Sequence, residues 1–226
     1  MADPRKTRER MIKAAIKAID IDGEAGVRVR DICRATNSTA PSVYYFFGDR
    51  LGLIRAAQAS RYQTPLAQIQ EVFAESVYKC KSKDEFTKVV HQILDLSFSD
   101  SRKDFRSTRI NVLGNAQSDR LLASEISEMN NQVNKISAEP IRYAQAKGWV
   151  DDDINPQMFY AWLIGTINGK VSIELDGHHP QSDDWDFIAK RAVCRLIGID
   201  EPKPTKKTQP RRKAAIGAEK RSRKAK

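Results

Sequence analysis

Apolar residues that recur every three to four positions constrain this chain more than any other feature of its sequence. Between Lys6 and Asp20, Met11, Ile12, Ala15, Ile16 and Ile19 fall on one stripe, and basic residues occupy the opposite face. This 3.6-residue period is the pattern of an amphipathic helix, and it returns in most later segments without any strand-like alternation. We therefore predict an all-α fold.

Turn and capping residues divide this pattern into segments. Gly23 and Gly26 end the first helix, and Asp49 caps a fourth helix that we expect to end near Tyr62. Pro140 is expected to kink or split a long helix, because proline removes a backbone hydrogen bond. The helices predicted are 6–20, 29–35, 40–46, 50–62, one beginning at 65, 82–99, 104–116, 119–147, 156–175 and 184–196.

A chain of 226 residues is long enough for a small helical domain and a second domain with a sizeable core. We predict an N-terminal domain over residues 1–62, a larger helical domain over 63–200, and a tail over 201–226. The tail places three prolines among Lys, Arg, Thr and Ala, with almost no apolar residues. Such a segment buries too little surface to offset its ordering entropy, so we expect it to be disordered.

The net charge of +10 comes entirely from this tail. From Lys203 onward there are eleven Lys or Arg and one acid, so the remaining residues are neutral as a whole. Net charge governs non-specific attraction rather than fold. The tail is therefore expected to attract polyanions, and the basic composition says little about any specific site.

Within the N-terminal domain, two short helices flank a turn at Asn37–Ser38, which is the spacing of a helix-turn-helix over Arg28–Phe47. In such a unit the second helix enters the DNA major groove with its first residues at the base edges. Small, hydroxyl and tyrosine side chains on that helix suit bases and phosphates, and arginines flank it. Mere solubilisation by these arginines remains the alternative. The predicted DNA contacts are Arg5, Lys6, Arg28, Arg30, Thr39, Ala40, Pro41, Ser42, Tyr44, Tyr45 and Arg50.

Residues 6–57 resemble the N-terminal domain of the tetracycline-repressor (TetR) family. The resembling segments are Ile12–Ala15, Val29–Cys33, Ser42–Arg50 and Leu53–Ile54. As in the family's pattern, a tyrosine follows Ile32 by twelve positions, and Phe47 and Arg50 then fall in place. Departures from the pattern are Arg28 for a capping Thr, Thr36-Asn37-Ser38 for Ala-Gly-Val, Phe46 for His and Arg50 for Lys. Asn37 can adopt the left-handed conformation that the family's glycine supplies.

This resemblance implies an all-helical homodimer whose C-terminal domain binds a ligand and gates DNA affinity. Residues Lys147–Asp151, Asn155–Pro156 and the apolar helix after them are similar to the family's dimerisation region. The predicted interface residues are Ile126, Met129, Gly165 and Gly169. The two glycines favour close approach by another helix, and a contact within the chain is an equal alternative.

The central helices carry many aromatic residues, and ligand pockets are apolar with a few polar groups. We predict a pocket for an apolar or aromatic small molecule, although aromatic residues at helical spacing are also typical of a plain core. Its predicted residues are Phe86, Phe105, Arg109, Tyr143, Trp162 and Thr166.

Other classes of function find little support. No common catalytic or nucleotide-binding motif is present, so we expect neither an enzyme nor a cofactor. The adjacent His178 and His179 lack helical ligand spacing, so no metal is expected, and the three cysteines are expected to be reduced. Without a signal peptide or a run of 18 apolar residues, the protein is expected in the cytoplasm, associated with the nucleoid, and not in a membrane.

The sequence thus predicts a dimeric repressor that binds a near-palindromic DNA operator and is released by a small effector. One alternative is an architectural protein that compacts DNA through its basic tail. Another is a small-molecule carrier or enzyme that has lost DNA binding.

Overall fold

The computed structural model describes residues 3–175 and 181–202, apart from the side chains of residues 64–68. The described residues form helices and their connections, with no strand, which confirms the all-α prediction. The tail from residue 203 onward and the loop with His178 and His179 lie outside them. The helices are α1 (Pro4–Asp22), α2 (Val29–Thr36), α3 (Ala40–Phe47), α4 (Arg50–Lys79), α5 (Lys83–Phe98), α6 (Lys103–Ala116), α7 (Arg120–Ala146), α8 (Pro156–Gly169), α9 (Val171–Glu174) and α10 (Ser182–Leu196), with short 3₁₀ turns η1 (Glu24–Gly26) and η2 (Asp100–Arg102).

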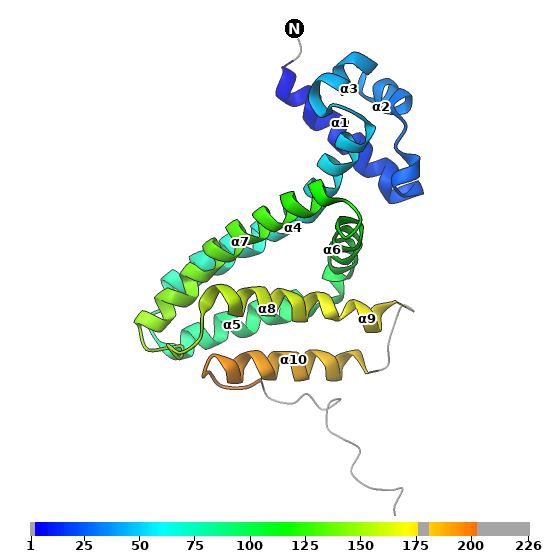
Figure 1. Cartoon of the computed structure of the whole chain (residues 1–226). Coiled ribbons are helices and arrows are strands. Elements are labelled where there is room, and N and C mark those ends of the chain that lie inside the picture. Colours follow the sequence, from blue (N-terminus) through cyan, green and yellow to red (C-terminus); the bar gives the residue numbers. More distant parts are fainter. Residues whose placement is uncertain (1–2, 176–180, 203–226) are drawn as a thin grey trace, which may run out of the picture.

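Helices α1 to α3 and the first turns of α4 pack into a small unit at one end of the molecule (Figure 1). The apolar stripe of α1 supplies Met11, Ala15 and Ile19 to its core. Val43 of α3 and Leu53 of α4 are fully buried against them. The periodicity of α1 therefore predicted its buried face correctly.

Helix α4 leaves this unit and continues without interruption for 30 residues. The predicted helix end near Tyr62 is wrong, and the predicted domain boundary falls inside a continuous helix. Tyr62 is buried in a cluster with Val112 of α6 and Leu122 of α7, so tertiary packing overrides the local signal of the proline at position 65. Helix α7, which lies along α4, likewise runs through Pro140 as one helix (Figure 1).

The second core lies among the remaining helices, where α5 packs between α7, α8 and α10. Its buried members include Phe86 and Leu94 of α5, Ile141 of α7, Phe159 of α8 and Val193 of α10. Helix α8 ends at Gly169 instead of running to residue 175, and the single turn of α9 follows it. None of the helices in the described ranges combines the length and apolar character that a membrane span requires.

Polar side chains close the N-termini of five described helices, the first of them α1, where the Asp3 carboxylate accepts a hydrogen bond from the Arg5 N–H at 2.9 Å. The Asp49 carboxylate accepts a hydrogen bond from the Gly52 N–H at 2.6 Å, which confirms the predicted cap of α4. Ser82, Asp119 and Asn155 cap α5, α7 and α8 in the same way. Each cap satisfies backbone donors that the first helical turn leaves unpaired.

Candidate nucleic-acid interface and ligand cavity

The turn between α2 and α3 has the geometry expected from its sequence. Asn37 has φ 48° and ψ 52°, which confirms the predicted left-handed conformation. The Ser38 N–H donates to the Cys33 carbonyl at 3.0 Å, and the buried Thr36 hydroxyl donates to the Ile32 carbonyl at 2.8 Å. These bonds satisfy carbonyls at the end of α2 and fix the angle at which α3 leaves the turn.

One face of α3 is held firmly by the small core. Val43 is fully buried, and Phe46 and Phe47 pack partly against the same cluster. The Arg8 guanidinium lies 5.3 Å from the centre of the Phe47 ring, which brings the basic start of α1 next to the end of α3. Gly48, at φ 78°, then ends the helix.

The opposite face of α3 is open to solvent. Tyr44 is 52% exposed and Tyr45 82% exposed, and Thr39, Ala40 and Pro41 are exposed as well. Ser42 is half-buried, and its hydroxyl lies 3.0 Å from the Thr39 hydroxyl, at hydrogen-bond distance. Thr39 occupies the N-cap position of α3, but its side chain does not bind a backbone N–H of the helix. The five predicted contacts on α3 and Thr39 thus lie together at one surface, and α3 contains no acidic residue.

Basic side chains lie on the neighbouring helices. Arg5 and Lys6 are exposed on the first turn of α1, and Arg28 and Arg30 are exposed at the start of α2. Arg28 occupies the N-cap position of α2 without a side-chain cap, as the departure from the family pattern implied. The Arg30 guanidinium lies 3.9 Å from the Asp31 carboxylate, a loose surface pair that leaves its charge available.

Arg50, which is predicted to contact DNA, also binds carbonyls within the chain. Its Nε donates to the Val27 carbonyl at 2.6 Å and its Nη2 to the Glu24 carbonyl at 2.5 Å. The side chain thereby ties the start of α4 to the loop before α2. The residue is half-buried, and its contact with DNA stays a prediction.

A polar junction joins the small unit to the larger one. The Glu24 carboxylate accepts hydrogen bonds from Gln58 of α4 at 2.6 Å and from Asn115 of α6 at 3.0 Å. Arg61 of α4 pairs with Asp20 of α1 at 2.8 Å. Movement of α6 relative to α4 therefore strains contacts that hold the helix-turn-helix unit.

An apolar cavity of about 90 Å³ lies inside the larger unit, between α4, α5, α6, α7, α8 and α10. Phe105 and Arg109 of α6 line it, as predicted. Most other lining side chains are aliphatic or aromatic, among them Phe73, Leu94, Phe159, Leu163 and Ile167. A cavity of roughly 150 Å³ with such walls is large enough to bind benzene, so this one must widen to admit a ligand of more than a few carbon atoms.

Four other residues predicted for the pocket lie elsewhere, which corrects that prediction. Phe86 and Tyr143 belong to an aromatic cluster around Trp149, with ring centres 6.0 Å from it in each case. Trp162 is 41% exposed, and the Thr166 hydroxyl donates to the Trp162 carbonyl on the outside of α8. Helical spacing alone did not show which aromatic residues line the cavity and which lie in the core or on the surface.

The four residues predicted for a dimer interface differ in their exposure. Ile126 is buried with Tyr62 in this chain, and Met129 packs on the same cluster, so neither forms an open surface. A Cβ on Gly169 would contact the Trp185 ring at 3.6 Å, which favours the alternative of a contact within the chain. Gly165 faces open space.

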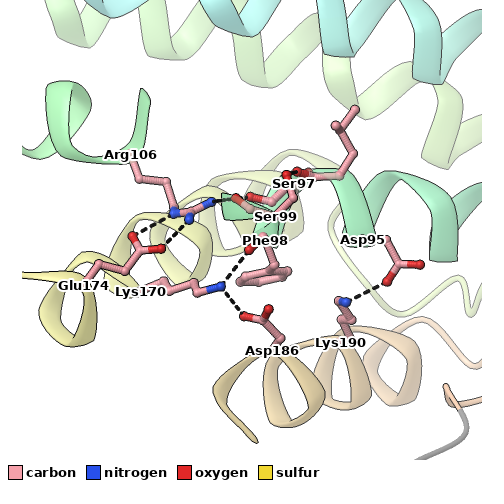
Figure 2. A network of polar contacts seen from close by, with 10 residues as sticks. Asp95, Ser97, Phe98, Ser99, Arg106, Lys170, Glu174, Asp186 and Lys190 are labelled. Atoms are coloured by element: carbon pink, nitrogen blue, oxygen red, sulfur yellow. Dashed lines mark hydrogen bonds and ion pairs between the residues drawn. The ribbon is translucent and has the colours of Figure 1, made fainter. Parts of the chain in front are cut away.

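Buried charges connect α5, α6, α9 and α10 (Figure 2). The fully buried Arg106 forms a two-bond ion pair with Glu174 and donates to the carbonyls of Ser97 and Ser99. Lys170 donates to the Phe98 carbonyl at 2.6 Å and pairs with Asp186 at 2.7 Å. These cations therefore close the C-terminal end of α5, where the helix dipole favours positive charge. The described residues contain no cluster of His, Cys, Asp and Glu that could hold a metal ion.

Comparison with known proteins shows which solved structures share this fold. No family model and no curated relative matches the sequence. Among solved structures, a TetR-family transcriptional regulator of Cytophaga hutchinsonii is 18% identical, with 90% of this chain and 99% of that chain covered and a TM-score of 0.63. A protein of Mesorhizobium loti assigned to the same family is 14% identical over 87% of this chain and 97% of its own, with a TM-score of 0.65. A TetR transcription regulator of Haloarcula marismortui is 14% identical over 86% and 97%, with a TM-score of 0.56. The chain therefore has the fold of TetR-family transcriptional regulators, over almost their whole length.

Proposed function

We propose that this protein binds double-stranded DNA through α3 and regulates transcription. The observation that carries the proposal is the outer face of α3, where two tyrosines stay exposed while Val43 on the inner face is fully buried. Contiguous exposed apolar surface of this kind is typical of interaction sites. Their hydroxyls, together with those of Thr39 and Ser42, suit phosphates and base edges.

Charge around α3 supports the same ligand. Exposed arginines and a lysine at the starts of α1 and α2 attract the phosphate backbone, while α3 itself carries no charge that would repel it. A helix of this size fits the major groove, and phosphate contacts from its neighbours fix its register. DNA binding of this kind also accounts for the expected association with the nucleoid.

We further propose a homodimer, since one α3 reads too few base pairs to specify an operator. Exposed apolar side chains on α8 and α10 support an interface there: Met158 is 59%, Trp162 41% and Ile188 66% exposed. Gly165 lies on α8 beside them and offers room for close approach. A two-fold dimer would place the two α3 helices on half-sites separated by whole turns of DNA.

The cavity and the polar junction support control by a small molecule. Helix α6 carries Arg109 at the cavity and Asn115 at the junction with Glu24, so both sites depend on the position of one helix. A ligand that favours a different position of α6 would shift the population of dimers away from the geometry that fits DNA. We propose that the protein is a repressor released in this way.

In-vitro selection of bound DNA tests this function. We expect selection with the full chain, and with a chain lacking residues 203–226, to enrich the same near-palindromic motif. Failure to enrich any motif would contradict specific DNA recognition and favour the carrier alternative. Loss of all binding on removal of the tail would favour the architectural alternative.

Removal of the two tyrosine hydroxyls of α3 then tests the proposed DNA interface. Tyr44→Phe combined with Tyr45→Phe should weaken binding to the selected motif by about tenfold or more, because hydrogen bonds to charged groups contribute about 1.5–3 kcal/mol each. Tyr78→Phe is the matched control, since this α4 tyrosine is 50% exposed in the larger unit. Equal affinities for the two variants would contradict the placement of DNA on α3.

A further inference from the structure

Helix α6 carries two buried arginines one turn apart, and they differ in their partners. Arg106 is fully buried and paired with the Glu174 carboxylate. Arg109 is 2% exposed, and none of the ion pairs between described residues includes it. The structure thus compensates one of these charges and leaves the other without an anion.

Neutral groups hold the Arg109 guanidinium. Its Nη2 donates to the Tyr62 hydroxyl at 2.7 Å, and its Nη1 donates to the Tyr62 carbonyl at 3.3 Å. The guanidinium also lies 3.8 Å from the centre of the Tyr62 ring and 5.6 Å from that of Phe105. The buried Nε has no hydrogen-bond partner among the described residues, so one strong donor remains free.

Burial of an unpaired cation is unfavourable, because the guanidinium loses its hydration without gaining a counter-charge. Burial accordingly lowers the pKa of Arg109 below its usual value, and the nearby tyrosines only partly oppose this. The contacts with Tyr62 and Phe105 oppose that cost, but neither residue supplies a counter-charge. Retention of such a group in a cavity wall is typical of a ligand site.

The position of Arg109 matches this role. It lines the apolar cavity and also two neighbouring hollows whose walls include more polar side chains, so it lies where the apolar lining gives way to a more polar one. Near it, Gln70 donates to the Tyr160 hydroxyl at 2.9 Å, and the Asn168 side-chain oxygen is buried without a donor among the described residues. The described lining of the apolar cavity contains Arg102 as a second cation and no Asp or Glu.

We propose that the cavity binds a small apolar molecule that carries one carboxylate, with the carboxylate paired to Arg109 and the apolar part among the side chains of α5, α8 and α10. A planar carboxylate accepts two parallel hydrogen bonds from a guanidinium, and its single negative charge matches the uncompensated positive charge. A cation would be repelled by both arginines. A neutral molecule would leave the charge unpaired.

This inference names the class of effector that would control the repressor. It rests on the proposed function only for what ligand binding does to DNA affinity. Binding itself is measured without DNA. Failure of the carboxylate to bind would therefore leave DNA recognition intact, and failure of DNA recognition would leave the ligand site intact.

The test compares three probes that share one chain: octanoate, octan-1-ol and octylamine. Isothermal titration calorimetry on the full-length protein should give an affinity for octanoate about ten- to a hundredfold higher than for octan-1-ol, from charge-assisted hydrogen bonding. Octylamine should bind more weakly than octan-1-ol. A series from butanoate to decanoate should then show an optimum set by the length of the cavity.

Variants assign the effect to Arg109. Arg109→Met should abolish the preference for octanoate over octan-1-ol, and Arg109→Lys should retain part of it. Arg142→Met is the matched control, because Arg142 forms a surface pair with Glu139 and lies outside the cavity. Equal binding of octanoate and octan-1-ol by the wild-type protein would overturn the proposal without recourse to any variant. Octanoate binding that survives Arg109→Met unchanged would do so as well.

Discussion

The buried pair between Arg106 and Glu174 makes a sharp prediction about stability. The exposed fraction is 0% for the Arg106 side chain and 6% for that of Glu174, and two hydrogen bonds join them. Glu174→Gln keeps the shape but removes the charge and turns one acceptor into a donor that faces a guanidinium N–H. Loss of one partner of a buried pair costs about 3–5 kcal/mol.

The measurement is urea unfolding followed by circular dichroism, at one fixed protein concentration because dimerisation contributes to apparent stability. Thermal unfolding of the same samples gives a second readout: for a chain of this length each kcal/mol lowers Tm by roughly 2–4 °C, so Tm should fall by roughly 6–20 °C. Glu139→Gln is the control, since its pair with Arg142 is 59% and 41% exposed. Surface pairs contribute about 0–1 kcal/mol.

A second pair of variants separates the ion pair from the cap on α5. Arg106→Met alone leaves the Glu174 carboxylate buried and unpaired, and it removes the donor to the Ser97 and Ser99 carbonyls. Arg106→Met combined with Glu174→Met removes the stranded charge but does not restore the cap. The double variant should therefore be more stable than Arg106→Met but less stable than wild type. Our reasoning is refuted if Glu174→Gln costs no more than Glu139→Gln.

Three further results are expected. Asp49→Ala should lower the free energy of unfolding by about 1 kcal/mol in the same urea experiment, because it removes the cap on the Gly52 N–H, and an unchanged value would contradict the cap. Removal of residues 203–226 should reduce affinity for random DNA. The slope of the logarithm of the binding constant against the logarithm of salt concentration should become shallower by about 0.9 for each phosphate that the tail neutralises, and an identical slope would mean that the tail does not bind DNA. Burial, reinforced by the charge of Glu201, raises the pKa of the Cys194 thiol to about 11. Iodoacetamide near neutral pH should therefore label Cys194 only after unfolding in urea, because the thiolate is the reactive form. Mass spectrometry measures the labelling, and rapid labelling of the folded protein would contradict this expectation.

The parts of the fold that sequence predicted well depend on neighbours in sequence. The turn at Asn37 follows from one residue that tolerates the left-handed conformation, and the cap at Asp49 from one carboxylate beside a helix start. The burial of Met11, Ala15 and Ile19 follows from the 3.6-residue period of α1. Each of these features is fixed within about one helical turn.

The errors arise where distant residues decide. The intrachain role of Arg50 was missed, because the carbonyls that bind its guanidinium lie 23 and 26 residues earlier in the chain. Helix α4 was expected to end near Tyr62, yet packing of Tyr62 against α6 and α7 keeps it continuous. Ile126 was expected at a dimer interface, yet the same cluster buries it within the chain.

The two arginines of α6 show the limit of sequence most clearly. Arg106 and Arg109 have the same charge, lie on the same helix and face the same interior, so no local pattern distinguishes them. Their roles diverge because Glu174, 68 residues away in sequence, reaches Arg106 while no described carboxylate reaches Arg109. The first arginine therefore joins α5, α6 and α9 through satisfied bonds, and the second keeps a free donor at the wall of a cavity. A buried charge becomes informative about ligand binding only when its partners in three dimensions are known, and here those partners separate a structural cation from a candidate site.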